Sequence, residues 1–183
     1  SMYIVKRRTG GAGNWAVWHT KLANTTTSYI LLDSTAAQST STSLWGSTAA
    51  TSTTIGIGTS VTTNNSTDTY VAYCWAAVKG FSAFGSYTGN GSTDGPFIYT
   101  GFRPKWVLIK CSSTTGSWVL WDTARNTYNA TDELLIPNSS GAAITPYAID
   151  ILSNGFKLRS VDGSYNGAQT YIYAAFAENP FKN

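Results

Sequence analysis

Charged residues are scarce in this sequence, making up only 11% of its 183 residues, and no run of about 18 apolar residues occurs. Without such a run we expect no membrane insertion. The scarcity of charge disfavours a protein of long helices, which are rich in Glu, Lys and Arg. It does not indicate disorder, because hydrophobic residues make up 42% of the chain and supply enough apolar surface for a core.

Basic residues are few and are not gathered on one face. The formal net charge is +3, and the only basic run is Lys6, Arg7 and Arg8. On a strand Arg7 would point away from its two neighbours. A nucleic-acid-binding protein usually presents a clustered basic face, so we expect no nucleic acid among the partners.

Cysteine is nearly absent as well. The chain has only Cys74 and Cys111, which is far fewer than the disulfide framework of a small secreted scaffold requires. We expect both to be free thiols.

Aromatic residues, in contrast, are abundant at 14% of the chain, with seven Trp and eleven Tyr. Aromatic and β-branched side chains suit the pleated surface of a sheet. Between the aromatic stretches lie runs rich in Ser, Thr and Asn, such as residues 62–68 (TTNNSTD), which are typical of turns. The composition therefore predicts an all-β fold.

Four blocks of sequence recur in the same order at a separation of about 103 residues. The clearest pair is GNWAVWHT and GSWVLWDT. In order, the paired blocks are residues 2–7 and 106–111, 13–20 and 116–123, 29–35 and 133–139, and 69–81 and 170–181. The repetition predicts an internal duplication, with a first β repeat at residues 2–81 and a second at residues 105–183.

Each block has the alternation or the apolar character of a strand. In residues 15–19 both Trp15 and Trp18 are large and apolar but face opposite sides, which indicates a central strand covered on both sides. We expect about five strands in each repeat. Because one such sheet cannot bury its apolar face alone, the two repeats should pack as a β-sandwich with a pseudo-twofold axis.

Two local features add to this fold. The connection at residues 82–104 is rich in Gly but also in aromatic residues, so we expect an ordered connecting strap with an extra strand at GPFIYTG. The whole chain would then be one compact domain. Asn154-Gly155 lies between two alternating stretches and predicts a hairpin with a type I′ turn.

The sequence carries no arrangement typical of catalysis. His19 is the only histidine and lies in a strand, and the nine carboxylates are scattered, whereas a catalytic triad, a metal centre or a glycosidase needs grouped side chains. We therefore expect no catalytic residue, no cofactor and no metal. A hydrolase remains the third and weakest of the functional classes.

Aromatic residues in loops are the best candidates for a binding site. Such rings, with Asn, Asp and Ser beside them, can stack on sugars while the polar groups bind hydroxyls. The other interpretation is that they cap the ends of the sandwich or fill a subunit interface. The candidate ligand-binding residues are Trp45, Tyr87, Asn90, Asp94, Tyr128 and Asp132.

Several motifs of the connecting strap and the second repeat resemble a domain of unknown function that is repeated in tail and tail-fibre-like proteins of marine tailed bacteriophages. These are GFRP at residues 101–104, WVLWDTAR at 118–125, SNGF at 153–156 and YIYAAFAENPF at 171–181. The first repeat departs from the pattern, with His19 where the second has Asp122. No enzymatic activity is implied by the resemblance, and no catalytic residue carries over from it.

The resemblance implies a non-catalytic virion structural or receptor-binding module of a bacteriophage tail or fibre. Such a protein would be made in the host cytoplasm and located in the virion. Its partners would be copies of itself in a homo-oligomer such as a trimer, other virion proteins, or a host surface glycan. The alternative is a carbohydrate-binding module or lectin-like domain.

Overall fold

The protein, described for residues 1–179 by a computed structural model, consists of strands and contains no helix in that range. The strands are β1 (Met2–Arg7), β2 (Trp15–His19), β3 (Ser28–Leu31), β4 (Ser39–Thr40), β5 (Tyr70–Trp75), β6 (Ser82–Thr88), β7 (Phe97–Tyr99), β8 (Pro104–Cys111), β9 (Trp118–Asp122), β10 (Ile149–Leu152), β11 (Gly155–Leu158) and β12 (Thr170–Ala177). The all-β class expected from the composition is confirmed. Accordingly, the described part of the chain offers no helix suited to crossing a membrane.

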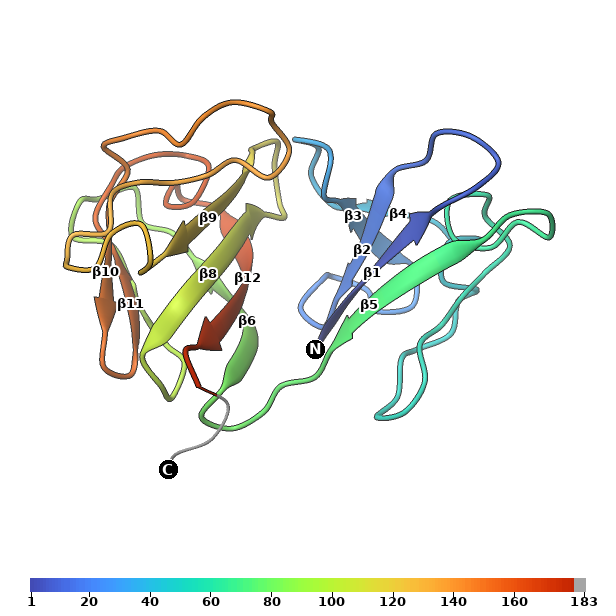
Figure 1. Ribbon diagram of the computed structural model, residues 1–183, viewed down its shortest axis with the longest axis horizontal. Helices are drawn as coiled ribbons and strands as arrows, with labels where there is room; N and C mark the ends of the chain where they lie inside the picture. The colour runs from blue at the N-terminus through green and yellow to red at the C-terminus, as the bar shows by residue number, and fades with distance from the viewer. Residues whose placement is uncertain (180–183) are drawn as a thin grey trace.

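The strands form three sheets, all of whose pairings are antiparallel. The five-stranded sheet has the order β4-β3-β2-β1-β5, the four-stranded sheet β6-β12-β8-β9, and the three-stranded sheet β10-β11-β7. Figure 1 shows the five-stranded sheet beside the other two, joined to them by the chain that leads from β5 to β6. The expected strand at GPFIYTG is β7.

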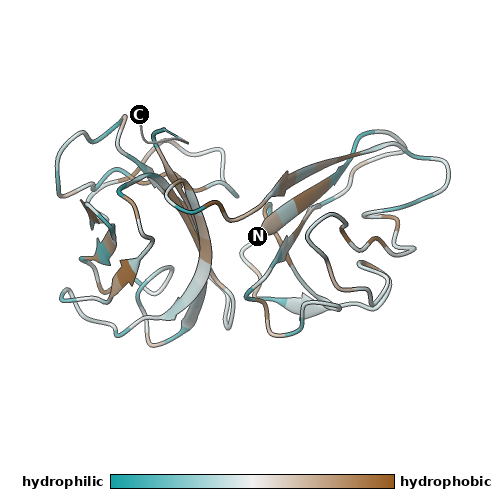
Figure 2. Ribbon diagram, turned by 90° about the horizontal axis from the view of Figure 1, so that it is seen from below, coloured by the Kyte–Doolittle hydropathy of each residue, from teal (hydrophilic) through white to brown (hydrophobic). Residues whose placement is uncertain are grey.

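The four-stranded sheet is the middle layer of the molecule. Its side chains Ile109 and Tyr171 share a buried cluster with Phe156 of the three-stranded sheet. On its opposite face, Leu108 and Ile172 share a second cluster with the five-stranded sheet. Figure 2, turned by 90°, shows the two halves side by side. The expected β-sandwich is therefore confirmed, with a third sheet added.

The two halves contain three strands with the same order and register. β2-β1-β5 in one sheet corresponds to β9-β8-β12 in the other. Trp75 lies opposite Met2 in the first half, as Phe176 lies opposite Trp106 in the second. This is the pairing that the aligned sequence blocks require. The duplication itself stays a prediction, and residues 180–183 of the second repeat lie outside the described residues.

The faces that meet in the middle are the same face of each three-strand set. Trp15 lies opposite Lys6 on this face, and Trp118 lies opposite Lys110. Trp118 is fully enclosed, and its indole N–H donates to the carbonyl oxygen of Leu31 in the other half at 2.8 Å. The two sheets are thus joined by packing and by side chains that reach across.

Lys110 is a fully buried cation at this junction. Its ammonium donates to the carbonyl oxygens of Ala36 and Gly116 at 2.8 Å and to those of Thr35 and Cys111 at 3.1 Å. Burial lowers the pKa of Lys110 to about 8. A buried charge is tolerated only where hydrogen bonds replace its hydration. Two of the four carbonyls belong to residues 35–36, so these bonds hold that segment of the first half against the second.

The outer face of the five-stranded sheet is covered by a loop rather than by another sheet. Residues 41–69 lie over it, and Leu44 and Trp45 pack on Tyr3 and Trp18. The two faces of β2 are therefore both covered, as expected. The ring of Trp45 is fully buried and its indole N–H donates to the carbonyl oxygen of Ser28 at 2.9 Å.

Two local expectations have different outcomes. Cys74 and Cys111 are free thiols, as expected. The hairpin of β10 and β11 is also present, but its type I′ turn is wrong, because neither Asn154 nor Gly155 has positive φ. Gly155 serves another purpose: a β-carbon there would lie 2.1 Å from the carbonyl oxygen of Ile98 on β7. Close contact between strands, not turn geometry, requires the glycine.

Replacing Trp118 by alanine should lower the free energy of unfolding by about 3–5 kcal/mol, because it removes a large buried ring. It also removes the bond to Leu31. The measurement is denaturant unfolding monitored by far-UV circular dichroism. Tyr128→Ala is the control, since Tyr128 is 85% exposed and its loss should change stability by less than about 0.5 kcal/mol. Equal stability of the two variants would contradict the packing of the sheets described above.

Candidate binding surface

Two of the six candidate residues lie in the interior rather than in surface loops. Trp45 has no exposed surface, so neither face of its ring is free for a ligand. Tyr87 belongs to β6, where its hydroxyl donates to the carbonyl oxygen of Tyr165 at 2.6 Å and its ring stacks on Tyr171 at 5.1 Å. Burial raises the pKa of Tyr87 well above its usual value. The expectation that these two rings form an exposed site is corrected: Trp45 is a core residue, and Tyr87 is partly buried with its ring packed against the core.

The other four candidates lie around the three-stranded sheet, but at opposite edges. Asn90 and Asp94 precede β7, and the Asp94 carboxylate lies 2.9 Å from the ammonium of Lys157 on β11. Tyr128 and Asp132 flank β10, because Thr131 between them exchanges main-chain hydrogen bonds with Ile149. The two loops therefore border one sheet without meeting each other.

The polar candidates mainly hold their own loops in place. The Asn90 side chain donates to the carbonyl oxygen of Asp94 at 3.0 Å and accepts from the main-chain N–H of Ser92 at 3.0 Å. Asp132 accepts a hydrogen bond from the Asn126 side chain at 3.4 Å. Tyr128 is 85% exposed and is the candidate aromatic residue that is free to contact a ligand, while the Asp94 side chain is 84% exposed but is engaged in ion pairs.

Between these loops, the outer face of the three-stranded sheet carries two exposed aromatic rings. Phe97 and Tyr99 are 45% and 66% exposed, whereas Ile98 between them is in the core. Gly155 lies opposite Tyr99, and the absence of a side chain there leaves room for the edge of the Phe97 ring, which lies 2.9 Å from where a β-carbon would be. We call the surface formed by Phe97, Tyr99 and Gly155 the aromatic platform.

A chain of ion pairs runs beside the aromatic platform. Asp94 pairs with Lys157 at 2.9 Å and with Arg159 at 3.8 Å, and Arg159 pairs with Asp150 at 2.6 Å. The hydrogen bond from Lys157 lowers the pKa of the Asp94 carboxyl. Pairs as exposed as these contribute little to stability. Their effect is to place hydrogen-bonding groups of both signs next to two apolar rings.

The sequence carries a signal for the aromatic platform in a strand rather than in a loop. In FIY at residues 97–99 the first and third side chains must share a face if the segment is a strand. The same alternation in FKLRS places Lys157 and Arg159 on one face. The sequence does not indicate that this face of the sheet is exposed to solvent.

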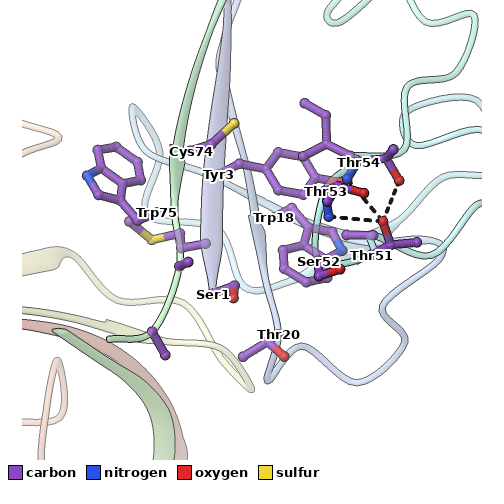
Figure 3. A pocket seen from close by; sticks show the side chains of 15 residues that line it. Ser1, Tyr3, Trp18, Thr20, Thr51, Ser52, Thr53, Thr54, Cys74 and Trp75 are labelled. Carbon is purple, nitrogen blue, oxygen red and sulfur yellow. Dashed lines mark hydrogen bonds between the residues drawn. The ribbon is translucent and has the colours of Figure 1, made fainter. Parts of the chain in front are cut away.

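A second feature is a groove of about 700 Å³ beside the five-stranded sheet. Tyr3 and Trp18 stack on each other with their ring centroids 4.9 Å apart. Figure 3 shows them on the face of the sheet toward the Thr51–Thr54 turn, with Cys74 and Trp75 on the strand at the edge. The hydroxyls of Thr51 and Thr54 bond to each other at 2.7 Å. None of the six candidate residues lines this groove.

His19, the only histidine, is enclosed at the junction of the two halves. Its Nε2 lies 3.1 Å from the carbonyl oxygen of Tyr173, and its Nδ1 accepts from the main-chain N–H of Lys21 at 3.1 Å. The ring is therefore neutral with its proton on Nε2, and burial lowers the pKa of His19 to about 4. Among residues 1–179, no group of three or more His, Cys, Asp or Glu is placed to hold a metal ion.

Comparison with known proteins gives one match. A family model described as a domain of unknown function, DUF7483, matches residues 1–180. No curated protein and no solved structure matches the chain.

His19 should make the protein less stable in acid. The folded pKa of about 4 lies below the unfolded value of 6.5, so the unfolded chain binds more protons between these values. The stability that the neutral ring contributes is complete above pH 6.5 and is lost as the pH falls to 4. The shift of about 2.5 units corresponds to about 3 kcal/mol.

Thermal or urea unfolding between pH 4 and 7 measures this dependence. His19→Gln, which keeps a donor and an acceptor, should flatten the pH profile over this range. An unchanged slope in that variant would show that other groups cause the acid sensitivity.

Proposed function

The chain belongs to the DUF7483 family, and we propose that it is a non-catalytic virion structural or receptor-binding module of a bacteriophage tail or fibre. In this role it binds a glycan of the host surface with the aromatic platform and is located in the virion after synthesis in the host cytoplasm. The phage context is supported by the resemblance of its second repeat to a domain of phage tail proteins. Glycan binding is supported by the exposed rings of the aromatic platform.

The observation that carries the proposal is the exposure of Phe97 and Tyr99 on a strand. Side chains on a strand are held in place by the sheet, so their rings lose little freedom on binding. A sugar ring has an apolar face that packs on an aromatic ring and hydroxyls at its rim that need hydrogen bonds. The paired Asp94 and Lys157 side chains lie beside the platform, with Lys157 opposite Phe97, and could supply those hydrogen bonds.

A single platform of this size supports only weak binding. Stacking on one or two rings with a few hydrogen bonds is typical of a millimolar Kd, or about −4 kcal/mol. Several linked platforms gain about 10²–10⁴ in avidity without any new contact. The proposal therefore includes a homo-oligomer such as a trimer, or assembly with other virion proteins.

The alternative is a carbohydrate-binding module or lectin-like domain that acts as a monomer. It is favoured by one feature: the aromatic platform is formed within a single chain. The two functions differ in the copy number that binding requires. Light scattering of the protein gives its mass, and binding of the same sample to an array of bacterial surface polysaccharides gives its ligand.

Tyr99→Ala should weaken binding to the array glycan about twofold to tenfold, because one aromatic contact contributes about 0.5–1.5 kcal/mol. Tyr128→Ala tests whether the site extends to the other edge of the sheet. Tyr73→Ala is the matched control: Tyr73 is also an exposed tyrosine but belongs to β5 in the other half. It should bind as the unchanged protein does.

Pull-down with host cells provides the second readout, with the same three variants. Equal binding by Tyr99→Ala and by the control would refute the platform as the site. A strict monomer that binds no glycan and no cell, yet degrades a polysaccharide, would refute the adhesion role and favour a hydrolase.

A further inference from the structure

The five-stranded sheet ends in a strand whose outer edge is free. β5 pairs with β1 and is the last strand in the order β4-β3-β2-β1-β5. Figure 1 shows its long arrow along the border of the sheet. Exposed edges in native proteins are usually protected by charged residues, proline or a bulge. The sequence of β5, YVAYCW, contains no charge and no proline, and its pairing with β1 is regular over all six residues.

The corresponding strand in the other half has a partner at this edge. β12 occupies the same place beside β8 that β5 occupies beside β1, with Phe176 in the position of Trp75. β6 then pairs with β12 on the far side, antiparallel, from Thr170 opposite Thr88 to Phe176 opposite Ser82. Within residues 1–179, no strand takes the place of β6 next to β5.

The free main-chain groups of β5 follow from its register. Arg8 donates to the carbonyl oxygen of Thr69, and in an antiparallel ladder the hydrogen-bonded pairs alternate with non-bonded ones. Every second residue therefore directs its N–H and C=O outward, namely Tyr70, Ala72 and Cys74. The equivalent residues of β12 are the ones that pair with β6.

The side chains of β5 are also exposed where those of β12 are covered. Tyr73 is 45% exposed, whereas Ala174 in the same position is 2% exposed. Cys74 is exposed, whereas its counterpart Ala175 is fully buried. Of the two corresponding strands, the one that lacks a neighbour is therefore the one with the uncovered side chains.

The groove of Figure 3 reaches the C-terminal end of this free edge. Its lining includes Cys74 and Trp75 at the end of β5, Ala76 and Ala77 beyond it, and the Thr51–Thr54 turn opposite. A strand placed beside β5 as β6 lies beside β12 would put the equivalents of Ala83 and Gly85 next to Cys74 and Ala72. Small side chains at those positions would fit between the edge and the turn.

From these observations we propose that the β5 edge binds an extended, uncharged polypeptide segment, which adds to the five-stranded sheet as a sixth, antiparallel strand. The segment has the chemistry of β6: small residues toward the groove and an aromatic residue, like Phe84, toward Tyr73. Main-chain hydrogen bonds to Tyr70, Ala72 and Cys74 supply affinity, and side-chain size supplies selectivity. This site is separate from the aromatic platform and does not depend on the glycan proposal.

The test uses the 183-residue chain and a fluorescent peptide with the sequence of residues 80–89, GFSAFGSYTG. Fluorescence anisotropy should show saturable binding. Ala72→Pro should weaken it at least tenfold, because it removes an outward N–H that β1 does not use, and proline is tolerated on an edge strand in that orientation. A peptide carrying Ala83→Pro and a scrambled peptide are the controls and should not bind.

Two further measurements locate the peptide. Bound peptide should slow hydrogen exchange of the Ala72 and Cys74 amides and the reaction of the exposed Cys74 thiol with a maleimide. If Ala72→Pro does not fold, Ala72→Lys takes its place. This variant adds a charge to the edge without altering the backbone and should also weaken binding of the peptide.

The proposal is overturned if the folded protein binds no peptide or if Ala72→Pro and Ala72→Lys both bind it with unchanged affinity. It is also overturned if light scattering shows a dimer that Ala72→Lys dissociates and that excludes the peptide, since the edge would then belong to a second copy of the chain.

Discussion

The contact between the five-stranded and four-stranded sheets is the constraint on which the rest of the structure depends. Each sheet has an apolar face that would be unstable in water, and a small sheet cannot bury such a face alone. Polar groups reinforce the contact: the Lys110 ammonium bonds to carbonyls of residues 35 and 36, and the Trp118 indole to Leu31. Because these donors bond to specific carbonyl oxygens of the first half, they fix one arrangement of the two sheets.

Much of this fold could be predicted from the sequence, because alternation and repetition are local properties. The pattern at residues 15–19 indicated a central strand covered on both sides, and β2 is buried on both faces. The paired blocks indicated a shared register, which the pairs of Trp75 with Met2 and Phe176 with Trp106 display. The burial of Lys110 could not be predicted, since two of its four carbonyl partners belong to residues about 75 positions away.

The candidate site was harder to predict, because exposure depends on what lies over a residue. Trp45 looked like a loop aromatic, yet its loop folds back over the five-stranded sheet and buries the ring. Tyr87 looked similar, yet it lies in a strand facing the three-stranded sheet. Phe97 and Tyr99 lie in a strand but are exposed, because the three-stranded sheet is the outermost layer and no described residue covers its outer face. Composition distinguishes none of these cases.

The same three-strand set is completed differently in the two halves. Around β12, the adjacent β6 and the three-stranded sheet together exclude water from Tyr171, Tyr173 and Ala175. Around β5, only the loop of residues 41–69 approaches, and the edge stays open. The second half, in which β6 covers the edge of β12, presents the aromatic platform on an outer face. The first half, in which the edge of β5 is free, presents main-chain donors and acceptors on that edge. One sheet pattern, covered in two ways, therefore yields two surfaces of different chemistry, one in each half of the chain.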